Sequence, residues 1–437
     1  MSRQMKDSGV AWIDDIPAHW KVVPVKIAFS EIKTKNTDGT VTNALKFKFG
    51  EIVPKTNFDS ESDDYVADTI LNYTIVEPRT IMINGLNLNY DFKTLRTGLV
   101  KEKGIITSAY LALKPNEDII DADYATFLFK GYESKMAFHN MGSGIRLTLG
   151  FKEFKNQPLL LPPLNEQRAI ADCIYQRCTD IDVAIAKTKT TIEEYKALKQ
   201  SIITEAVTKG IRGDRPMKDS GIEWIGEIPA EWELSRLKMM FSFGKGLPIT
   251  KENLIEEGIS VISYGQIHSK TNNGTSINES LIRYVSNSYI ETNDESLVSR
   301  DDFIFADTSE DLEGCGNCVY VDNDSILFAG YHTIIVRSNE RRNNKYFAYL
   351  FKTDCWRSQI RSKVSGVKLF SISKRILSET SLLLPTMEEQ ESIVSYLDQK
   401  CSEIDRLIEK KTLLLEEMET FKKSLIFDYV TGKKEVM

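Results

Sequence analysis

The segment Met5-Lys6-Asp7-Ser8-Gly9-Val10-Ala11-Trp12-Ile13-Asp14-Asp15-Ile16-Pro17-Ala18-His19-Trp20 returns as Met217-Lys218-Asp219-Ser220-Gly221-Ile222-Glu223-Trp224-Ile225-Gly226-Glu227-Ile228-Pro229-Ala230-Glu231-Trp232. Eleven of the 16 paired positions are identical. A second repeat, Leu159–Thr208 against Leu382–Thr431, has 20 of 50 positions identical. The stretches between the repeats barely resemble each other. One frame repeated around two different inserts predicts two different recognition surfaces held at a fixed separation.

The second repeat has the spacing of a long helix. With Ile174 and Leu397 as heptad starts, both copies share one register with an apolar seam. Each copy begins after a proline, has acidic residues in its first turn, where the helix dipole favours them, and ends near a glycine. The predicted seam residues are Ile174, Cys178, Ile181, Ile185 and Ile192 in the first helix and Leu397, Cys401, Ile404, Ile408 and Leu415 in the second.

Polar residues interrupt this seam at four positions. Such interruptions usually fix the register of paired helices, and they also leave open a pairing with a third protein. Cys178 and Cys401 occupy equivalent positions, and we interpret them as small buried seam residues. The four interrupting residues are Thr188, Lys199, Lys411 and Lys422.

The two inserts, about Lys21–Pro158 and Glu233–Ser381, have the pattern of mixed α/β domains. Short β-rich runs alternate with Gly, Asn and Asp turns. Each insert ends with an aromatic, helix-like stretch, Tyr124–Phe129 or Tyr346–Phe351, and then a glycine-containing turn. We therefore expect both inserts to share one fold with twisted sheets. The clearest strand candidates are Tyr73–Val76, Thr80–Ile83, Phe303–Phe305 and Thr333–Val336.

Composition indicates a globular protein of at least two domains, with 437 residues of which 41% are hydrophobic. The N-terminal residues lack the apolar core of a secretory signal, and no apolar run is long enough to span a bilayer, so we expect a cytoplasmic protein. Six cysteines are too few for a disulfide scaffold in a chain of this length.

The charge distribution is uneven. A formal net charge of -7 argues against a protein that coats nucleic acid. The segment Arg337–Arg375 nevertheless holds eleven basic residues against two acidic ones. This segment is a candidate phosphate-facing surface, and the alternative interpretation is a solvated helix face.

The patterns of several catalytic and metal sites are absent from the sequence. Gly244-Lys245 and Gly432-Lys433 lack the upstream glycine of a phosphate-binding loop, and Pro162-Pro163 lacks the flanking residues of an adenine methyltransferase motif. Cys315-Gly316-Asn317-Cys318 has zinc-like spacing, but no second cysteine pair follows it. The carboxylates of Asp307–Glu313 could hold a cation, although scattered loop carboxylates are more often solvated. We expect no metal site in this chain.

With these residues considered together, the chain resembles the specificity subunit of a type I restriction-modification enzyme over nearly its whole length. The family's opening segment matches Met217–Gly221 with Trp224–Gly226 and Ile228-Pro229, and more loosely the first copy, where Asp14 replaces a glycine. The family's junction before each long helix matches Leu161–Gln167 and Leu384–Gln390, with Thr386 and Met387 as mild departures.

The resemblance implies an α/β (α+β) protein in which two target-recognition domains are separated by two long antiparallel coiled-coil helices, with a pseudo-two-fold internal repeat. It implies a first recognition domain with its repeat segment at residues 1–158 and a second at 213–381. The spacer helices would then occupy residues 159–212 and 382–437.

The function implied by the resemblance is non-catalytic reading of a split, asymmetric sequence in double-stranded DNA, one half per domain. Two methyltransferase subunits would dock on the chain, and two motor-nuclease subunits would complete the restriction complex. The chain itself would carry no cofactor, because S-adenosylmethionine, ATP and magnesium would belong to those partners.

Basic residues near the end of each insert are the predicted DNA contacts, with solvated surface cations as the alternative for each. Arg146 and Lys368 follow the paired turns Ser143-Gly144 and Ser365-Gly366, which suggests a shared loop that contacts the DNA backbone. A different class of protein, a coiled-coil adaptor that displays two α/β domains to protein partners, is the competing interpretation, and the acidic composition supports it. The predicted contacts are Lys130, Lys135, Arg146, Arg357, Arg361, Lys363 and Lys368.

Overall fold

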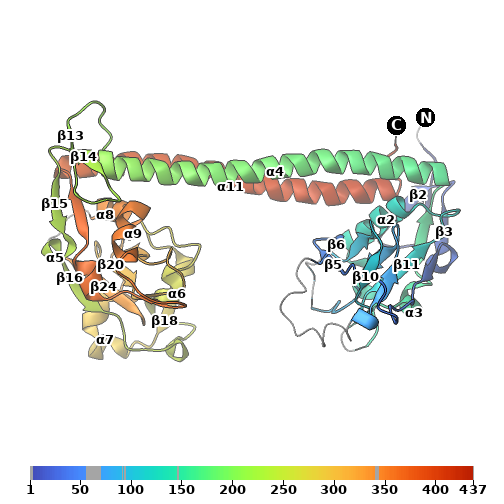
Figure 1. The fold of residues 1–437 in the computed structure, drawn as a ribbon, viewed down its shortest axis with the longest axis horizontal. Coiled ribbons are helices and arrows are strands. Elements are labelled where there is room, and N and C mark those ends of the chain that lie inside the picture. Colours follow the sequence, from blue (N-terminus) through green and yellow to red (C-terminus); the bar gives the residue numbers. More distant parts are fainter. Residues whose placement is uncertain are drawn as a thin grey trace. The chain divides into compact units, whose positions relative to one another are not determined.

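The computed structural model describes residues 3–55, 70–90, 92, 95–144, 147–339 and 344–436, with Asn140 described by its backbone only. The chain forms two compact units, the first from Met1–Thr190 with Lys411–Met437 and the second from Thr191–Lys410. Each of two long helices, α4 (Leu164–Lys209) and α11 (Met387–Val430), therefore contributes one part to each unit (Figure 1). None of the helices in the described part of the chain is both long and apolar enough to cross a membrane.

A four-stranded antiparallel sheet, in the order β4-β11-β8-β9, forms the centre of the first unit. Its inner strand β8 is buried on both faces, because Ile81 and Ile83 join one apolar cluster while Met82 joins another. The strands are β1 (Met5–Asp7), β2 (Asp15–Pro17), β3 (Lys21–Pro24), β4 (Phe29–Glu31), β5 (Leu45–Lys48), β6 (Glu51–Pro54), β7 (Thr74–Val76), β8 (Ile81–Ile83), β9 (Thr97–Leu99), β10 (Gly104–Ile106), β11 (Leu111–Pro115) and β12 (Pro158–Leu161). The shorter helices are η1 (Val25–Ile27), α2 (Ala122–Ser134), η2 (Ala137–Asn140) and α3 (Phe151–Phe154).

The second unit contains two four-stranded sheets, in the orders β16-β24-β20-β22 and β18-β17-β23-β19. The inner strand β20 is again buried on both faces, since Phe303 and Phe305 join one cluster and Ile304 another. The strands are β13 (Met217–Asp219), β14 (Glu227–Pro229), β15 (Glu233–Arg236), β16 (Phe241–Lys245), β17 (Ile259–Ile262), β18 (Arg283–Val285), β19 (Leu297–Val298), β20 (Phe303–Ala306), β21 (Thr308–Ser309), β22 (Cys318–Tyr320), β23 (Leu327–Ala329), β24 (Thr333–Ser338), β25 (Phe370–Ser371) and β26 (Ser381–Leu384). The shorter helices are α5 (Leu237–Met240), η3 (Lys251–Asn253), α6 (Tyr264–Ile267), η4 (Glu279–Leu281), α7 (Tyr289–Thr292), η5 (Asp294–Ser296), α8 (Lys345–Phe351), α9 (Asp354–Arg361) and α10 (Lys374–Ser378).

The long helices pack side by side with their directions opposed. In the first unit Lys422 Nζ binds the Asp182 carboxylate at 2.6 Å, and in the second Lys199 Nζ binds Asp405 at the same distance. Two of the three lysines that interrupt the predicted seam, Lys199 and Lys422, are thus paired across the two helices. Of the seam residues, Ile174, Cys178, Ile192, Leu397, Cys401 and Ile404 are buried, and Ile181, Ile185, Ile408 and Leu415 are partly buried.

One aromatic helix in each unit packs against the long helices. In the first unit the Tyr124 hydroxyl of α2 donates to the carbonyl of Val430, and a Cβ added to Gly131 would lie 2.9 Å from the Val430 side chain. In the second unit the Tyr346 hydroxyl of α8 donates to the carbonyl of Val207. The same frame therefore positions a different insert in each unit.

The opening repeat anchors the first turn of each long helix. In the second unit Arg215 Nη1 and Trp232 Nε1 donate to the two oxygens of Glu389, and the Arg215 guanidinium lies 5.3 Å from the Trp232 ring centre. In the first unit Arg3 and His19 donate to Glu166 in the same way. Burial pushes the pKa of Glu166 upward, but these hydrogen bonds and the charge of Arg3 outweigh it and hold the pKa below its usual value.

The two ends of the described chain meet in the first unit, beside β2 (Figure 1). Lys433 Nζ lies 3.3 Å from Asp14 Oδ2, and Arg3 Nε lies 3.9 Å from Glu435 Oε1. A Cβ on Gly432, where φ is +71°, would lie 2.4 Å from Pro17 Cδ, so this close approach requires glycine.

Candidate nucleic-acid interface

In the second unit, aromatic and histidine side chains gather where β23 turns into β24. The rings of Tyr331 and His332 in this turn lie 5.6 and 5.4 Å from that of Tyr264, at the start of α6. His332 Nδ1 lies 3.3 Å from Asp307 Oδ1, which follows β20, and the histidine side chain is 59% exposed. We call Tyr264, Asp307, Tyr331 and His332 the His–Tyr cluster. Its ring faces and its donors and acceptors are groups that can contact base edges.

A second histidine, His268, holds the loop that carries Asp307 of this cluster. His268 Nε2 donates to the carbonyl of Thr308 at 2.8 Å, and Nδ1 accepts from the Asn317 amide at 3.1 Å. These two bonds match the neutral tautomer with its proton on Nε2. The loop that carries Asp307 and Thr308 is thereby fixed against α6.

Two lysines lie at the same end of the sheet. Lys245 pairs with Ile334 at the end of β16, and the next residue, Gly246, donates its backbone amide to Thr333. Lys374 Nζ donates to the carbonyl of Phe243, two residues before Lys245. Burial lowers the pKa of Lys374, and the charge of Lys245 adds to the effect. Cations beside exposed rings are suited to hold phosphates while the rings and polar groups reach bases.

The first unit presents a different surface, which consists of apolar rings. Phe49 is 86% exposed at the tip of the β5–β6 hairpin, and Tyr90, Phe92 and Leu95, between β8 and β9, are 74%, 56% and 44% exposed. Phe92 stacks on His139 with 5.0 Å between ring centres and 12° between planes. We call Phe49, Tyr90, Phe92 and Leu95 the aromatic tip.

Local backbone requirements position the aromatic tip. Phe49 and Gly50 both have positive φ, 50° and 76°, as a two-residue type I′ hairpin turn demands. A Cβ on Gly50 would lie 3.0 Å from Leu95, so the hairpin and the loop meet there. The fully buried Arg96 donates through Nη1 to the carbonyls of Asn84 and Leu86, which fixes the loop's base.

The predicted contacts of the first unit point in different directions. Lys130 on α2 is partly buried close to Glu133 and Lys422, and burial lowers its pKa. Lys135 is exposed, and its Nζ lies 4.5 Å from the Phe427 ring centre. Arg146 lies outside the described residues. Neither Lys130 nor Lys135 belongs to the aromatic tip.

The predicted contacts of the second unit divide between inward and exposed positions. Arg357 Nε donates to the carbonyl of Phe351, and Arg361 binds Asp354 and the carbonyl of Glu313. Lys363 and Lys368 are exposed after α9, in a segment where Val367 is 95% exposed. Lys363 and Lys368 are the two of these four that are exposed, and neither forms an ion pair with a described residue.

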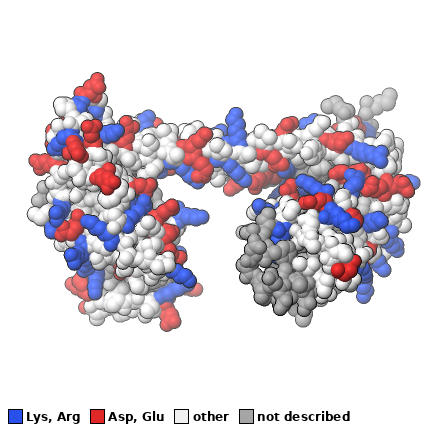
Figure 2. All heavy atoms as spheres, in the orientation of Figure 1, with Lys and Arg blue, Asp and Glu red and all other residues white. Residues whose placement is uncertain are grey.

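Reasoning from charge alone missed both surfaces. Figure 2 shows Lys and Arg mixed with Asp and Glu over the visible face of each unit, so charge singles out no one patch on that face. A possible signal for the aromatic tip was an aromatic residue directly before Gly50 in an alternating Lys-Phe-Lys-Phe run. Among the described residues there is no group of three or more His, Cys, Asp or Glu side chains that could hold a metal ion. Cys315 and Cys318 are both buried, and burial raises the pKa of each thiol.

Comparison with known proteins identifies relatives along nearly the whole chain. The MjaVIII type I restriction enzyme specificity subunit of Methanocaldococcus jannaschii is 24% identical over 432 residues, which cover 96% of this chain and 94% of that protein. The putative MjaX specificity subunit of the same organism is 24% identical over 450 residues, with 97% and 96% covered.

Two solved structures have the same fold. A structure reported with the complex assembly and conformational transition of the type I R-M system aligns with a TM-score of 0.68 and 14% identity, covering 96% of this chain and 99% of that one. The HsdS subunit from Thermoanaerobacter tengcongensis aligns with a TM-score of 0.52 and 14% identity, covering 96% and 98%. The model of the type I restriction modification DNA specificity domain matches residues 96–194 and 229–417, more than half of the chain. The duplicated frame, the two unlike inserts and this match together show that the chain belongs to the type I restriction-modification DNA specificity family.

Proposed function

We propose that this chain reads a split, asymmetric sequence in double-stranded DNA and directs adenine methylation or restriction to it. One observation carries the proposal. Equivalent frames present unlike surfaces, the aromatic tip in the first unit and the His–Tyr cluster with Lys245 and Lys374 in the second. Unlike surfaces on equivalent frames suit two unlike half-sites, because base edges carry the sequence information and each surface offers different groups to them.

The chemical steps and their cofactors belong, in this proposal, to other subunits. The chain acts as a non-catalytic reader in the cytoplasm, with two methyltransferase subunits and two motor-nuclease subunits as partners. S-adenosylmethionine, ATP and magnesium are bound by those partners. For this function residues 1–158 and 213–381 act as the recognition domains, and residues 159–212 and 382–437 act as the spacer helices.

The test is the pattern of adenine methylation across a genome when the chain is co-expressed with its methyltransferase subunit, compared with a strain that lacks the chain. We expect a two-part motif that appears only when the chain is present. Tyr90→Ser should relax one half of the motif, and the double variant Tyr264→Ser, His332→Ala should relax the other half. Each loss should amount to about 1–3 kcal/mol of discrimination at the affected bases.

Tyr175→Ser is the matched control, because Tyr175 is a 68% exposed tyrosine on α4 outside both surfaces. Its motif should be unchanged. If no motif depends on the chain while the methyltransferase still binds it, DNA reading is wrong and the adaptor interpretation gains support. If both halves relax together in either variant, the assignment of one surface to one half is wrong.

A further inference from the structure

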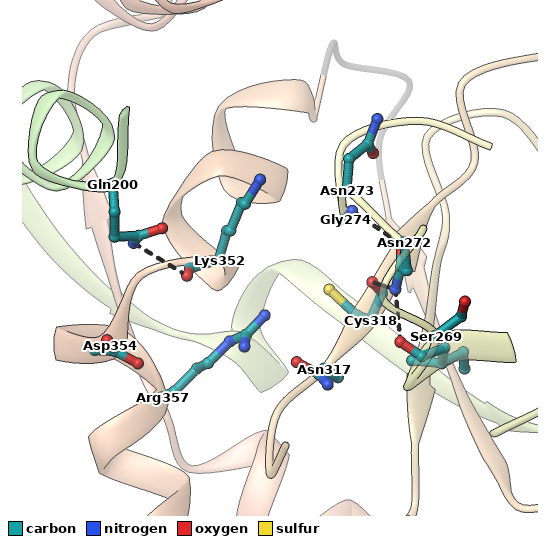
Figure 3. Close-up of a pocket in the computed structure, with 11 residues that line it drawn as sticks. Gln200, Ser269, Asn272, Asn273, Gly274, Asn317, Cys318, Lys352, Asp354 and Arg357 are labelled. Carbon is teal, nitrogen blue, oxygen red and sulfur yellow. Dashed lines mark hydrogen bonds between the residues drawn. The ribbon is translucent and has the colours of Figure 1, made fainter. Parts of the chain in front are cut away.

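A polar pocket in the second unit lies apart from the His–Tyr cluster, between α4, the break from α8 to α9, and the loop after α6 (Figure 3). Its volume is about 260 Å³. Gln200 and Lys352 line it on one side and Asn272 and Asn273 on the other. This volume falls just below the usual range for small-molecule sites, roughly 300–1,000 Å³, so the pocket suits a single small group.

Two cations extend into this pocket without an acid partner. Figure 3 shows the Lys352 and Arg357 side chains reaching from the helices toward the loop that carries Asn272 and Asn273. Arg357 uses its Nε to donate to Phe351, and neither its terminal nitrogens nor Lys352 Nζ forms an ion pair with a described residue. Burial lowers the pKa of Arg357, so its charge is poorly solvated.

Three carboxylates near these cations are bound to other partners. Asp405 pairs with Lys199, Asp398 accepts from Lys345 and Tyr349, and Asp354 pairs with Arg361. The Cys318 thiol beside Arg357 has its pKa raised to about 12 by burial, so it adds no negative charge. The lining therefore holds two cations, Lys352 and Arg357, and one carboxylate, Asp354, which is already paired with Arg361.

The far wall of the pocket is rigid. The Asn272 amide donates to the carbonyls of Ile267 and Cys318, and its oxygen accepts from the Gly274 backbone amide. Asn273 holds its own turn by accepting from Thr275 and Ser276. A fixed wall opposite two cations is a preorganised arrangement for a ligand.

The first unit lacks this arrangement, although its sequence aligns with it. Lys130 follows Phe129 as Lys352 follows Phe351, and Lys135 stands where the second unit has Arg357. In the first unit α2 continues to Ser134 and Lys135 lies over the Phe427 ring. In the second unit the helix breaks between Phe351 and Asp354, and the new helix α9 turns Arg357 into the pocket.

We propose that this pocket binds one phosphate group through the Lys352 ammonium and the Arg357 guanidinium. A phosphate oxyanion matches two cations that line one pocket, since charge-assisted hydrogen bonds to phosphate are short and strong and arginine binds it with two parallel donors. The phosphate comes either from a free phosphorylated ligand or from the backbone of bound DNA. The first source goes beyond the proposed function, whereas the second rests on it.

The test measures trace acetylation of lysines by mass spectrometry on the full chain, with inorganic phosphate as the probe and chloride at matched ionic strength as the reference. Burial and the charge of Lys199 lower the pKa of Lys352 to about 8, and Cys401, Arg357 and Asp405 also face it. Bound phosphate stabilises the ammonium, so Lys352 acetylation near pH 8 should fall by up to about tenfold for each unit that the pKa rises. Lys130 is the internal control in the same sample and should be unaffected.

Arg357→Gln should abolish the phosphate effect at Lys352 while leaving Lys130 unchanged. Arg357→Lys, which keeps the charge, covers the case in which Arg357→Gln fails to fold and should retain a weaker effect. Equal protection of Lys352 and Lys130, or none at either, overturns the proposal.

A parallel arm replaces phosphate with duplex DNA. Protection by phosphate alone assigns a free ligand, and protection by the duplex as well assigns the DNA backbone. In the second case Lys352→Gln should make the plot of log binding constant against log salt concentration shallower by about one unit of slope. Because the phosphate arm needs neither DNA nor methyltransferase, its outcome is distinguishable from a failure of DNA reading.

Discussion

Phe49 has a backbone conformation that favours asparagine or glycine. Its φ of 50° lies in the left-handed region, yet the residue carries a large ring that is 86% exposed. Both features lower stability, since a left-handed bulky residue costs about 1 kcal/mol or more and the ring gains nothing from burial. Retention of such a residue at a hairpin tip suggests a ring that inserts into a partner, as apolar wedges do between base steps.

Phe49→Asn should therefore raise stability and weaken recognition at the same time. Asn-Gly is a preferred pair for a type I′ turn, so the free energy of unfolding of the first unit should rise by about 1 kcal/mol. Chemical denaturation measures this gain, and the efficiency of target methylation measures the loss. Phe49→Tyr keeps the ring and should change neither quantity much. A variant that gains stability and keeps full methylation would show that the ring is not used.

Lys352 provides a pH-dependent prediction. Its folded-state pKa of about 8 lies below the usual lysine value of 10.5, so folding disfavours the protonated form. The penalty is complete below about pH 8 and disappears as the pH rises through the unfolded-state value. In phosphate-free buffer Lys352→Met should be more stable than the parent chain near pH 7, and the difference should shrink by about pH 10. A variant that is less stable at both pH values would indicate that the ammonium already makes favourable contacts within the chain.

At the scale of single residues, charge in the sequence was a poor guide to the direction of a side chain. Lys363 and Lys368 are exposed, whereas Arg361 is held by Asp354 seven residues earlier and Arg357 turns inward at the start of α9. A charged residue in a helix faces inward or outward according to where that helix begins. The helix α9 begins at the cap formed by Thr353, whose hydroxyl accepts from the Trp356 backbone amide, and a charge count does not contain this signal.

At the scale of elements, the long helices and the strands were predictable because their signals are periodic and local. The runs Thr80–Ile83 and Thr333–Val336 supply β8 and β24, and the aromatic stretches supply α2 and α8. The break between α8 and α9 was not predictable from the repeat, since the aligned residues of the first unit continue as one helix. The conformation of the loop at residues 84–90 depends on hydrogen bonds from Arg96, which lies beyond this loop in the sequence.

The anchors at the two helix starts should differ in strength. The Glu389 and Arg215 side chains are 3% and 10% exposed, whereas those of Glu166 and Arg3 are 23% and 19% exposed. Removing one partner of a buried ion pair costs roughly 3–5 kcal/mol, and more exposed pairs contribute less. Glu389→Gln should therefore destabilise its unit more than Glu166→Gln does. Hydrogen exchange of peptides over residues 215–232 and 3–20 measures each anchor separately, and equal effects would contradict the prediction.

At the scale of the whole molecule, the contact between the chain ends resembles an internal connection. Gly432 follows the end of α11 as Gly210 follows the end of α4, although one residue apart in the repeat register, and Arg3 aligns with Arg215 before the second opening repeat. Both glycines have positive φ, 71° and 77°. At Gly210 and Arg215 the chain is continuous, whereas Gly432 and Arg3 lie near its two ends.

A circular permutant should therefore fold. The old ends are joined by a short Gly-Ser linker, and new ends are opened between Arg212 and Gly213, which are exposed. We expect a melting temperature near that of the parent chain and the same methylation motif, because no packed side chain is removed. A permutant opened between Ile192 and Glu193, inside α4, is the matched control and should fail to fold. Failure of the first permutant would show that the order of synthesis matters.

The aromatic helices contact the long helices at Val430 and Val207, which are equivalent positions of the second repeat. Each anchor joins Glu166 or Glu389 of that repeat to residues in or just before the opening repeat. The residues with which each insert would recognise a target are therefore separate from the residues that hold the insert on the long helices. Because the residues that hold the inserts occur twice in similar sequence, a genetic crossover within the repeats would replace one insert and keep its contacts with the long helices. Specificity in such a protein can change by exchange of whole modules, without the gradual loss of stability that accompanies residue-by-residue change.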